Sequence, residues 1–247
     1  MCARRAAPPV CYRGFVKFSS KARAWAARVL AGLALVAWPH AAAPQAPDRP
    51  PVMEVARNLQ RSYQNVRDFS ADFVHAYSGG VLGQQVTERG TVLIRKPLKM
   101  RWTYTSPEKK VFVSDGVKLY SYIPQDRQVI VSSIPTDETS TPTLFLAGKG
   151  NITRDFVVGW ADVPQAPPDT YALKLEPTRR EPDYESLVLV VDRKTYQLRM
   201  LLTTDRQGGK STFTFSRLRE NINLPDREFT FQIPRGVEVV YSDSPIR

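Results

Sequence analysis

The stretch QVTERGTVLIRKPLKMRWTYT, residues 85–105, is the part of the chain that decides the fold class. It holds two runs joined at Pro97, and in the second run Met100 and Trp102 alternate with polar neighbours such as Arg101. A period of two residues is that of a β-strand with one buried face, and a proline at the junction favours a turn. The stretch therefore predicts two strands that pair antiparallel across a short connection.

Runs of the same kind continue along most of the chain, each bounded by residues that favour turns. They cover residues 69–73, 110–116, 118–123, 128–134, 170–177, 186–192, 197–205 and 210–218. Connections this short favour antiparallel pairing, and about ten or eleven strands are too many for a flat open sheet. We therefore expect a mainly β fold, a strongly curved antiparallel sheet of about eleven strands that is closed or half closed into a barrel.

Two segments depart from this period. Residues 52–63 carry apolar side chains at three- and four-residue spacing, which predicts an amphipathic helix. In residues 135–160, the apolar groups at 144–146 and 152–157 fit one or two short helices. These helices either cover the open side of the sheet or fill its core, and periodicity leaves both alternatives open.

The last strand signal is FTFQIPRGVEVV, residues 229–240. Two aromatic residues alternate with polar ones, Pro-Arg-Gly follows, and a second apolar run comes after it. This pattern predicts a strand, a turn and a strand that complete the curved sheet.

The charge of the chain is concentrated at its start. Of 35 basic residues, seven lie in residues 1–46 with no acidic residue, so the remainder carries +4 of the net +11. The apolar run Val29–Trp38 is shorter than the roughly 20 residues of a transmembrane helix but fits a signal peptide. We expect a signal peptide and leader at 1–46 and one domain at 47–247; an uncleaved anchor is the alternative.

The chemistry that most enzymes need is scarce after this leader. Both cysteines lie within it, His75 is the one histidine of residues 47–247, and no Gly-x-Ser-x-Gly or phosphate-binding glycine motif is present. A metal site, a cofactor and a catalytic role are therefore not expected. Basic and aromatic residues interleave at 99–104, but strand alternation alone produces that pattern, so we expect no binding of nucleic acid.

Several segments follow one another in a characteristic order. They are FSADF (69–73), GTVLIRKPLKMRW (90–102), VSDGVKLYSYIP (113–124), TPTLFLAG (141–148) and FTFQIPRGVEVV (229–240). This order resembles the outer-membrane lipoprotein carrier family, LolA-like proteins of the Gram-negative periplasm. The resemblance covers roughly residues 52–241, nearly all of the expected domain.

The resemblance implies an unclosed antiparallel barrel with a helical lid over an apolar cavity. It also implies a non-enzymatic periplasmic chaperone that binds the acyl chains of outer-membrane lipoproteins. Such a chaperone receives lipoproteins from an inner-membrane ABC transporter and passes them to an outer-membrane receptor. We expect this chain to act as a monomer without a cofactor.

Large strand residues are the candidates for the lining of such a cavity. The candidates are Phe73, Met100, Trp102, Phe112, Tyr120 and Tyr122. By resemblance, Leu144, Phe145 and Leu146 form the lid, and Lys96 stands where relatives often have an arginine that hydrogen-bonds the lid. Lysine lacks the planar fork of arginine donors, so such a latch would be weaker here. Periodicity does not distinguish a lined cavity from a solid core.

Other functions remain as alternatives. A periplasmic carrier of another lipid, such as a phospholipid or a glycolipid, would need the same apolar surface. A hydrolase that uses paired carboxylates carries no fixed sequence spacing. The outer-membrane receptor shares the architecture, but no cysteine follows the apolar run of the leader in a lipobox arrangement.

Overall fold

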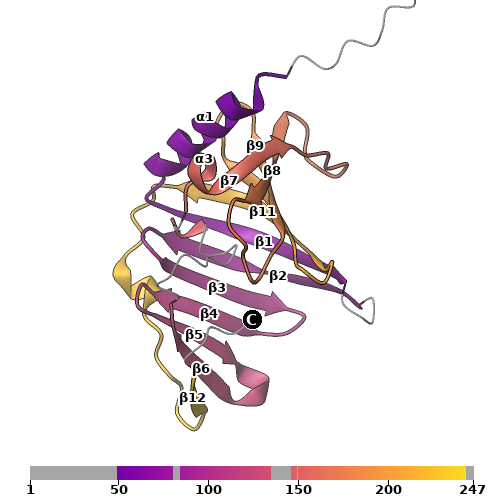
Figure 1. Cartoon of the computed structure of the whole chain (residues 1–247). Helices are drawn as coiled ribbons and strands as arrows, with labels where there is room; N and C mark the ends of the chain where they lie inside the picture. The colour runs from indigo at the N-terminus through magenta and orange to yellow at the C-terminus, as the bar shows by residue number, and fades with distance from the viewer. Residues whose placement is uncertain (1–48, 80–83, 135–145, 149, 243–247) are drawn as a thin grey trace, which may run out of the picture. The chain divides into compact units, whose positions relative to one another are not determined.

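The computed structural model describes residues 49–79, 84–134, 146–148 and 150–242 (Figure 1). The expected signal peptide lies outside the described residues, as do Leu144 and Phe145. The helices are α1 (Val52–Asn65), α3 (Ile152–Asp155), η1 (Pro124–Asp126) and η2 (Asp226–Phe229). Within the described ranges, no helix has the length and hydrophobicity that a transmembrane helix needs.

Twelve strands form a single curved sheet. The strands are β1 (Asp68–Gly79), β2 (Gln84–Arg95), β3 (Lys99–Ser106), β4 (Lys110–Asp115), β5 (Lys118–Ile123), β6 (Gln128–Ser133), β7 (Phe156–Trp160), β8 (Thr170–Pro177), β9 (Ser186–Asp192), β10 (Leu198–Thr204), β11 (Lys210–Glu220) and β12 (Glu238–Ser242). Their order is β12-β6-β5-β4-β3-β2-β1-β11-β10-β9-β8-β7, so β1 and β11 join the two halves. Because β7 and β12 are not paired with each other, the sheet does not close, which confirms the predicted fold class.

The register of the sheet places the predicted alternation on one face. Ala71, Val92, Trp102 and Phe112 are direct partners across β1, β2, β3 and β4, so their side chains share a face. We call this the inner face, because α1 packs against it. Next to this row, Gly90 pairs with Phe73, and a Cβ at Gly90 would lie 2.8 Å from the Phe73 ring.

Aromatic side chains pack edge to face at the centre of the inner face. The ring centroid of Phe73 lies 5.1 Å from that of Trp102 and 4.9 Å from that of Tyr104, and Trp102 lies 5.3 Å from Phe213. Each such pair contributes roughly 0.5–1.5 kcal/mol beyond the area that it buries. This cluster forms the centre of the core.

Helix α1 follows its predicted position and buries its apolar stripe, Val55, Ala56 and Leu59. The four residues of α3 are held by Asn151, whose side-chain oxygen accepts hydrogen bonds from the backbone of the first turn. Gln60 of α1 accepts a 2.7 Å hydrogen bond from the Ile152 amide, which ties α3 to α1.

The helical prediction was wrong for the residues that follow α3. Phe156 and Val157 belong to β7, which pairs with β8 from Phe156–Pro177 to Trp160–Leu173. A short apolar run carries no decisive period, and here the backbone groups of β8 offer it a hydrogen-bonding partner. Two adjacent β-branched residues, Val157 and Val158, also favour the strand.

The prediction for residues 229–240 was wrong in its first half. Residues 221–237, here called the C-terminal strap, contain η2 and no strand, and the β12 that follows them runs parallel to β6. The strap crosses the outer face of the sheet, where Arg101 Nη2 donates a 2.8 Å hydrogen bond to the Thr230 carbonyl. The strap carries the chain from the end of β11 to the edge of the sheet formed by β6. There β12 pairs with β6 and runs in the same direction as β6.

Candidate functional site

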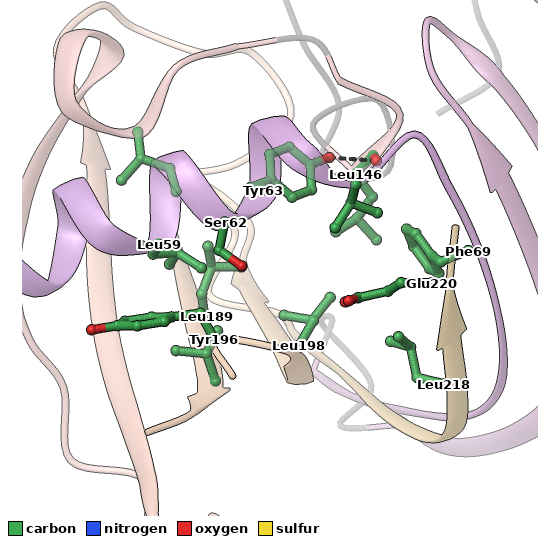
Figure 2. A pocket seen from close by; sticks show the side chains of 13 residues that line it. Leu59, Ser62, Tyr63, Phe69, Leu146, Leu189, Tyr196, Leu198, Leu218 and Glu220 are labelled. Carbon is green, nitrogen blue, oxygen red and sulfur yellow. Dashed lines mark hydrogen bonds between the residues drawn. The ribbon is translucent and has the colours of Figure 1, made fainter. Parts of the chain in front are cut away.

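A small cavity lies between α1 and the inner face of the sheet (Figure 2). It has a volume of about 40 Å³. Its lining consists of Leu59, Ser62 and Tyr63 from α1, Val66, Phe69, Leu146, Ile152, Leu189, Val191, Tyr196, Leu198, Leu218 and Glu220. A water molecule needs about 10–15 Å³ of such volume, so the cavity has room for only a few waters. An acyl chain enters it only if α1 or the segment around Leu146 moves.

Four of the predicted cavity residues lie on the inner face, but they do not line this cavity. Phe73 and Trp102 are each 2% exposed, Met100 is buried, and Phe112 is half-buried beside them. Phe73, Met100 and Trp102 belong to the buried core cluster, and Phe112 packs against it. The indole Nε1–H of Trp102 is nevertheless buried without a hydrogen-bond partner among the described residues.

The structure does not bring Tyr120 and Tyr122 together with the other candidates. In the pairing of β4 with β5, Ser121 is the partner of Phe112, so both tyrosines point to the outer face. There their ring centroids lie 5.4 Å and 5.9 Å from that of Phe231 in the C-terminal strap. The outer face of β5 is therefore covered by the strap, and alternation alone could not show which face is the inner one.

The end of the predicted lid is tied to its surroundings. Leu146 is 1% exposed, and its carbonyl oxygen accepts a hydrogen bond from the Tyr63 hydroxyl of α1. The carbonyl of Ala147 accepts a 2.9 Å hydrogen bond from the amide of Leu98, in the β2–β3 turn. These two contacts hold the segment over the cavity.

Lys96, the predicted latch, reaches α1 as well as the lid segment. Its Nζ donates a hydrogen bond to the Tyr63 carbonyl and lies 3.2 Å from the centroid of the Tyr63 ring. Its methylenes pack under Gly148, where an added Cβ would lie 3.1 Å from Lys96 Cδ. Burial lowers the pKa of Lys96 to about 8, while the charge of Glu220 opposes that shift.

Sequence reasoning missed Tyr63 and Glu220 as site residues. Tyr63 carried a signal, since it lies on the apolar stripe of the helix. No pattern in the sequence indicates Glu220. The pairing of β1 with β11 shifts register between Ser70 and Asp72. On the opposite strand, Arg217 has a φ of 52° at this position. This β-bulge turns Glu220 to the inner face, as partner of Phe69.

A second polar group lies at the other end of the inner face. His75 Nδ1 lies 3.0 Å from Glu88 Oε2, and its Nε2 lies 3.1 Å from Ser211 Oγ. Lys110 also pairs with Glu88, at 2.5 Å, and the His75 ring stacks on Phe213. The group links β1, β2, β4 and β11. In the described part of the chain, no three His, Cys, Asp or Glu side chains are placed to hold a metal ion.

Comparison with known proteins places these features in a family. The family model of the outer membrane lipoprotein carrier protein LolA matches residues 64–232. The outer-membrane lipoprotein carrier protein of Chromohalobacter salexigens is 30% identical over 187 residues, which cover 75% of this chain and 86% of that protein. Its counterpart in Nitrosomonas europaea is 32% identical over 151 residues, covering 61% of this chain and 71% of the relative.

A solved LolA superfamily protein from Nitrosomonas europaea covers 71% of this chain and 97% of its own, with a TM-score of 0.41 and 16% identity. Because this TM-score and identity are low, membership of a family rests on the sequence matches. The family model spans more than half of the chain, and the carrier protein of Chromohalobacter salexigens is matched over most of its length. This chain therefore belongs to the LolA family of outer membrane lipoprotein carrier proteins.

Proposed function

We propose that this chain is a periplasmic carrier of outer-membrane lipoproteins that holds their acyl chains between α1 and the inner face of the sheet. In this proposal residues 1–46 direct export, an inner-membrane ABC transporter loads the carrier, and an outer-membrane receptor unloads it. Membership of the family supports the proposal, because relatives matched over most of their length are named outer-membrane lipoprotein carrier proteins.

The apolar lining under α1 is the observation that carries the proposal. Leucine, valine and aromatic side chains from α1, β1, β9, β10 and β11 surround the cavity, with few polar groups among them. Such a surface suits a ligand that gains by leaving water, at about 0.8 kcal/mol for each buried methylene. It offers no set of reactive groups for catalysis, so a carrier fits it better than an enzyme.

The energy of opening is compatible with this role. Three hydrogen bonds hold the lid side of the cavity: Tyr63 to Leu146, Leu98 to Ala147, and Ile152 to Gln60. Each contributes about 0.5–1.5 kcal/mol net, so breaking all three costs about 1.5–4.5 kcal/mol. About six buried methylenes offset that cost. A long acyl chain therefore offsets the cost of these hydrogen bonds more fully than a short one does.

We place the aromatic cluster as the floor of the opened site. Phe73, Met100, Trp102 and Phe112 already share the inner face. The indole N–H of Trp102 has no hydrogen-bond partner among residues 49–79, 84–134, 146–148 and 150–242, and it would find an acceptor in the ester or amide carbonyl of an acylated ligand. A buried donor left unpaired costs roughly 1–3 kcal/mol, so such a carbonyl would bind favourably there.

Photocrosslinking tests the proposed site. A benzophenone amino acid is placed at Leu198, in the cavity lining, or at Val117, in the exposed β4–β5 turn with an exposed fraction of 73%. A synthetic diacylated lipopeptide should label at position 198 and not at position 117. Equal labelling at both positions would contradict the site. Labelling by phosphatidylglycerol alone, with none by the lipopeptide, would instead favour a carrier of another lipid.

A further inference from the structure

A carboxylate points into the largely apolar cavity. Glu220 is the last residue of β11, and Figure 2 shows its side chain extending toward the middle of the lining, between Leu146 and Leu198. The lining has three hydroxyl groups as well, those of Ser62, Tyr63 and Tyr196. The hydroxyl of Tyr63 donates to the Leu146 carbonyl, and that of Ser62 donates at 3.3 Å to the Thr195 carbonyl. The hydroxyl of Tyr196 accepts a 3.1 Å hydrogen bond from the Asn58 side chain. None of these three contacts involves Glu220.

The groups that face Glu220 satisfy its carboxylate only in part. The side chain of Gln197 donates one hydrogen bond to it. The positive charges of Lys96 in the β2–β3 turn and Arg199 in β10 also stabilise the carboxylate. Burial raises the pKa of the Glu220 carboxyl against these three influences. A carboxylate has about four acceptor sites, so free capacity remains on the cavity side.

We propose that Glu220 selects the head group of the ligand by accepting a hydrogen bond from an N–H group that adjoins the acyl chain. The same carboxylate disfavours acyl ligands that end in a carboxylate or phosphate, since two like charges would meet in a poorly hydrated space. This inference rests on the proposed function and adds to it the chemistry of the preferred ligand. Glu220 acts in it as a specificity-determining residue.

Two sources could supply such an N–H group. One is the amide of an acylated amino terminus, and the other is the ammonium of an ethanolamine phospholipid. In the phospholipid a phosphate lies between the ammonium and the acyl chains, so its negative charge would reach Glu220 first. The acylated peptide therefore fits the site better.

A matched pair of single-chain amides isolates the hydrogen bond. N-methylhexadecanamide and N,N-dimethylhexadecanamide have the same acyl chain and differ by one N–H. The wild-type protein should bind the first about tenfold more tightly, because a hydrogen bond to a charged group contributes about 1.5–3 kcal/mol. In Glu220→Leu this preference should disappear. Affinities are measured by displacement of a fluorescent fatty acid that the protein is first shown to bind.

Charge is tested with a variant of nearly equal volume. Glu220→Gln keeps a carbonyl acceptor and removes the negative charge, so its affinity for hexadecanoate should rise several-fold above that of the wild type. Glu108→Gln changes an exposed carboxylate in the β3–β4 turn and should leave every affinity unchanged. Thermal melts establish that each variant folds. If Glu220→Leu does not fold, the hexadecanoate comparison in Glu220→Gln decides the matter alone.

The outcomes separate the two claims. Equal binding of both amides by the wild type overturns the role of Glu220 and leaves the carrier function standing. Failure of every acyl probe to bind overturns both. A synthetic acylated lipopeptide should lose affinity in Glu220→Leu, while phosphatidylethanolamine in detergent micelles should not. The reverse result would overturn the acylated peptide as the ligand.

Discussion

The hydroxyl of Tyr63 donates its hydrogen to the backbone carbonyl of Leu146, across the cavity that lies under α1 (Figure 2). Tyr63 thereby joins the helix that covers the inner face to the segment between β6 and β7. Both residues are part of the cavity lining, so their hydrogen bond must break if a ligand is to separate them. The carbonyl of Tyr63 also accepts from Lys96. One residue therefore connects the lid segment, α1 and the β2–β3 turn.

Tyr63→Phe should ease the opening of the cavity. The change removes one hydroxyl and leaves the buried Leu146 carbonyl unpaired, which costs roughly 1–3 kcal/mol in the closed state. We expect faster uptake of a fluorescent fatty acid and faster hydrogen exchange of the Leu98 and Ile152 amides. Tyr241→Phe, at an edge position that is 75% exposed, is the control. Unchanged uptake and exchange in Tyr63→Phe would show that this bond does not hold the cavity closed.

Lys96→Leu should impair transfer more than loading. The variant removes the ammonium that holds the Tyr63 carbonyl and keeps an apolar side chain beneath Gly148. The empty closed state then competes less well with the lipid-bound state, so the carrier should keep its cargo longer. Measured with a lipoprotein, release into outer-membrane vesicles should fall while loading stays near normal. Normal transfer would remove Lys96 from the mechanism and leave the cavity in place.

The lowered pKa of Lys96 predicts a gain of stability at alkaline pH. Burial brings this pKa from 10.5 to about 8. Between these values the unfolded chain holds a proton that the folded protein has released, so stability rises with pH across this window. Urea unfolding at about pH 7.5 and about pH 9.5 should show a larger gain for the wild type than for Lys96→Leu. An equal gain would mean that Lys96 titrates normally.

Glutamate substitutions should distinguish the fully buried residues of the aromatic cluster from the half-buried ones. Trp102→Glu places a carboxylate in a position that is 2% exposed, so the variant should not fold. Phe112 is half-buried, and Phe112→Glu should fold but bind acyl probes at least tenfold more weakly. Tyr122→Glu, on the outer face, should bind them normally. Circular dichroism and probe titration measure both properties, and weak binding by Tyr122→Glu would contradict the assignment of faces.

His75 predicts a loss of stability in weak acid. Burial lowers its pKa below the ordinary 6.5, and Glu88 opposes this only in part. The unfolded chain then binds the proton more readily, so stability is complete above pH 6.5 and declines as the pH falls below it. His75→Gln should flatten the pH dependence of the urea midpoint between about pH 7 and about pH 5. An unchanged slope would place the titration elsewhere.

Local patterns in the sequence were sufficient for much of the fold. The alternation of Phe69, Ala71 and Phe73 predicted β1 and its buried face, and three- and four-residue spacing predicted α1. Short turns such as Asp115–Gly116 carry their own signal, since Asp115 Oδ1 accepts the 2.8 Å hydrogen bond of the Val117 amide. Strand order for the hairpins followed from short connections, because neighbouring strands have few other partners within reach.

Contacts between distant segments decided the rest. Phe231 covers Tyr120 and Tyr122, so the face of β5 with the larger side chains became the outer one. The same strap brings β12 to β6 in parallel, which no local pattern encodes.

The cavity itself depends on the register of β1 with β11. The bulge at Arg217 reverses the alternation that Phe213 and Phe215 establish, and it turns Leu218 and Glu220 toward α1. The sequence by itself determines the strands, the helix α1 and the short turns, because these follow from local periodicity and turn residues. Which face becomes the inside, and which acid meets the ligand, depends on pairing energies between strands far apart in the chain, and only the tertiary structure decides them.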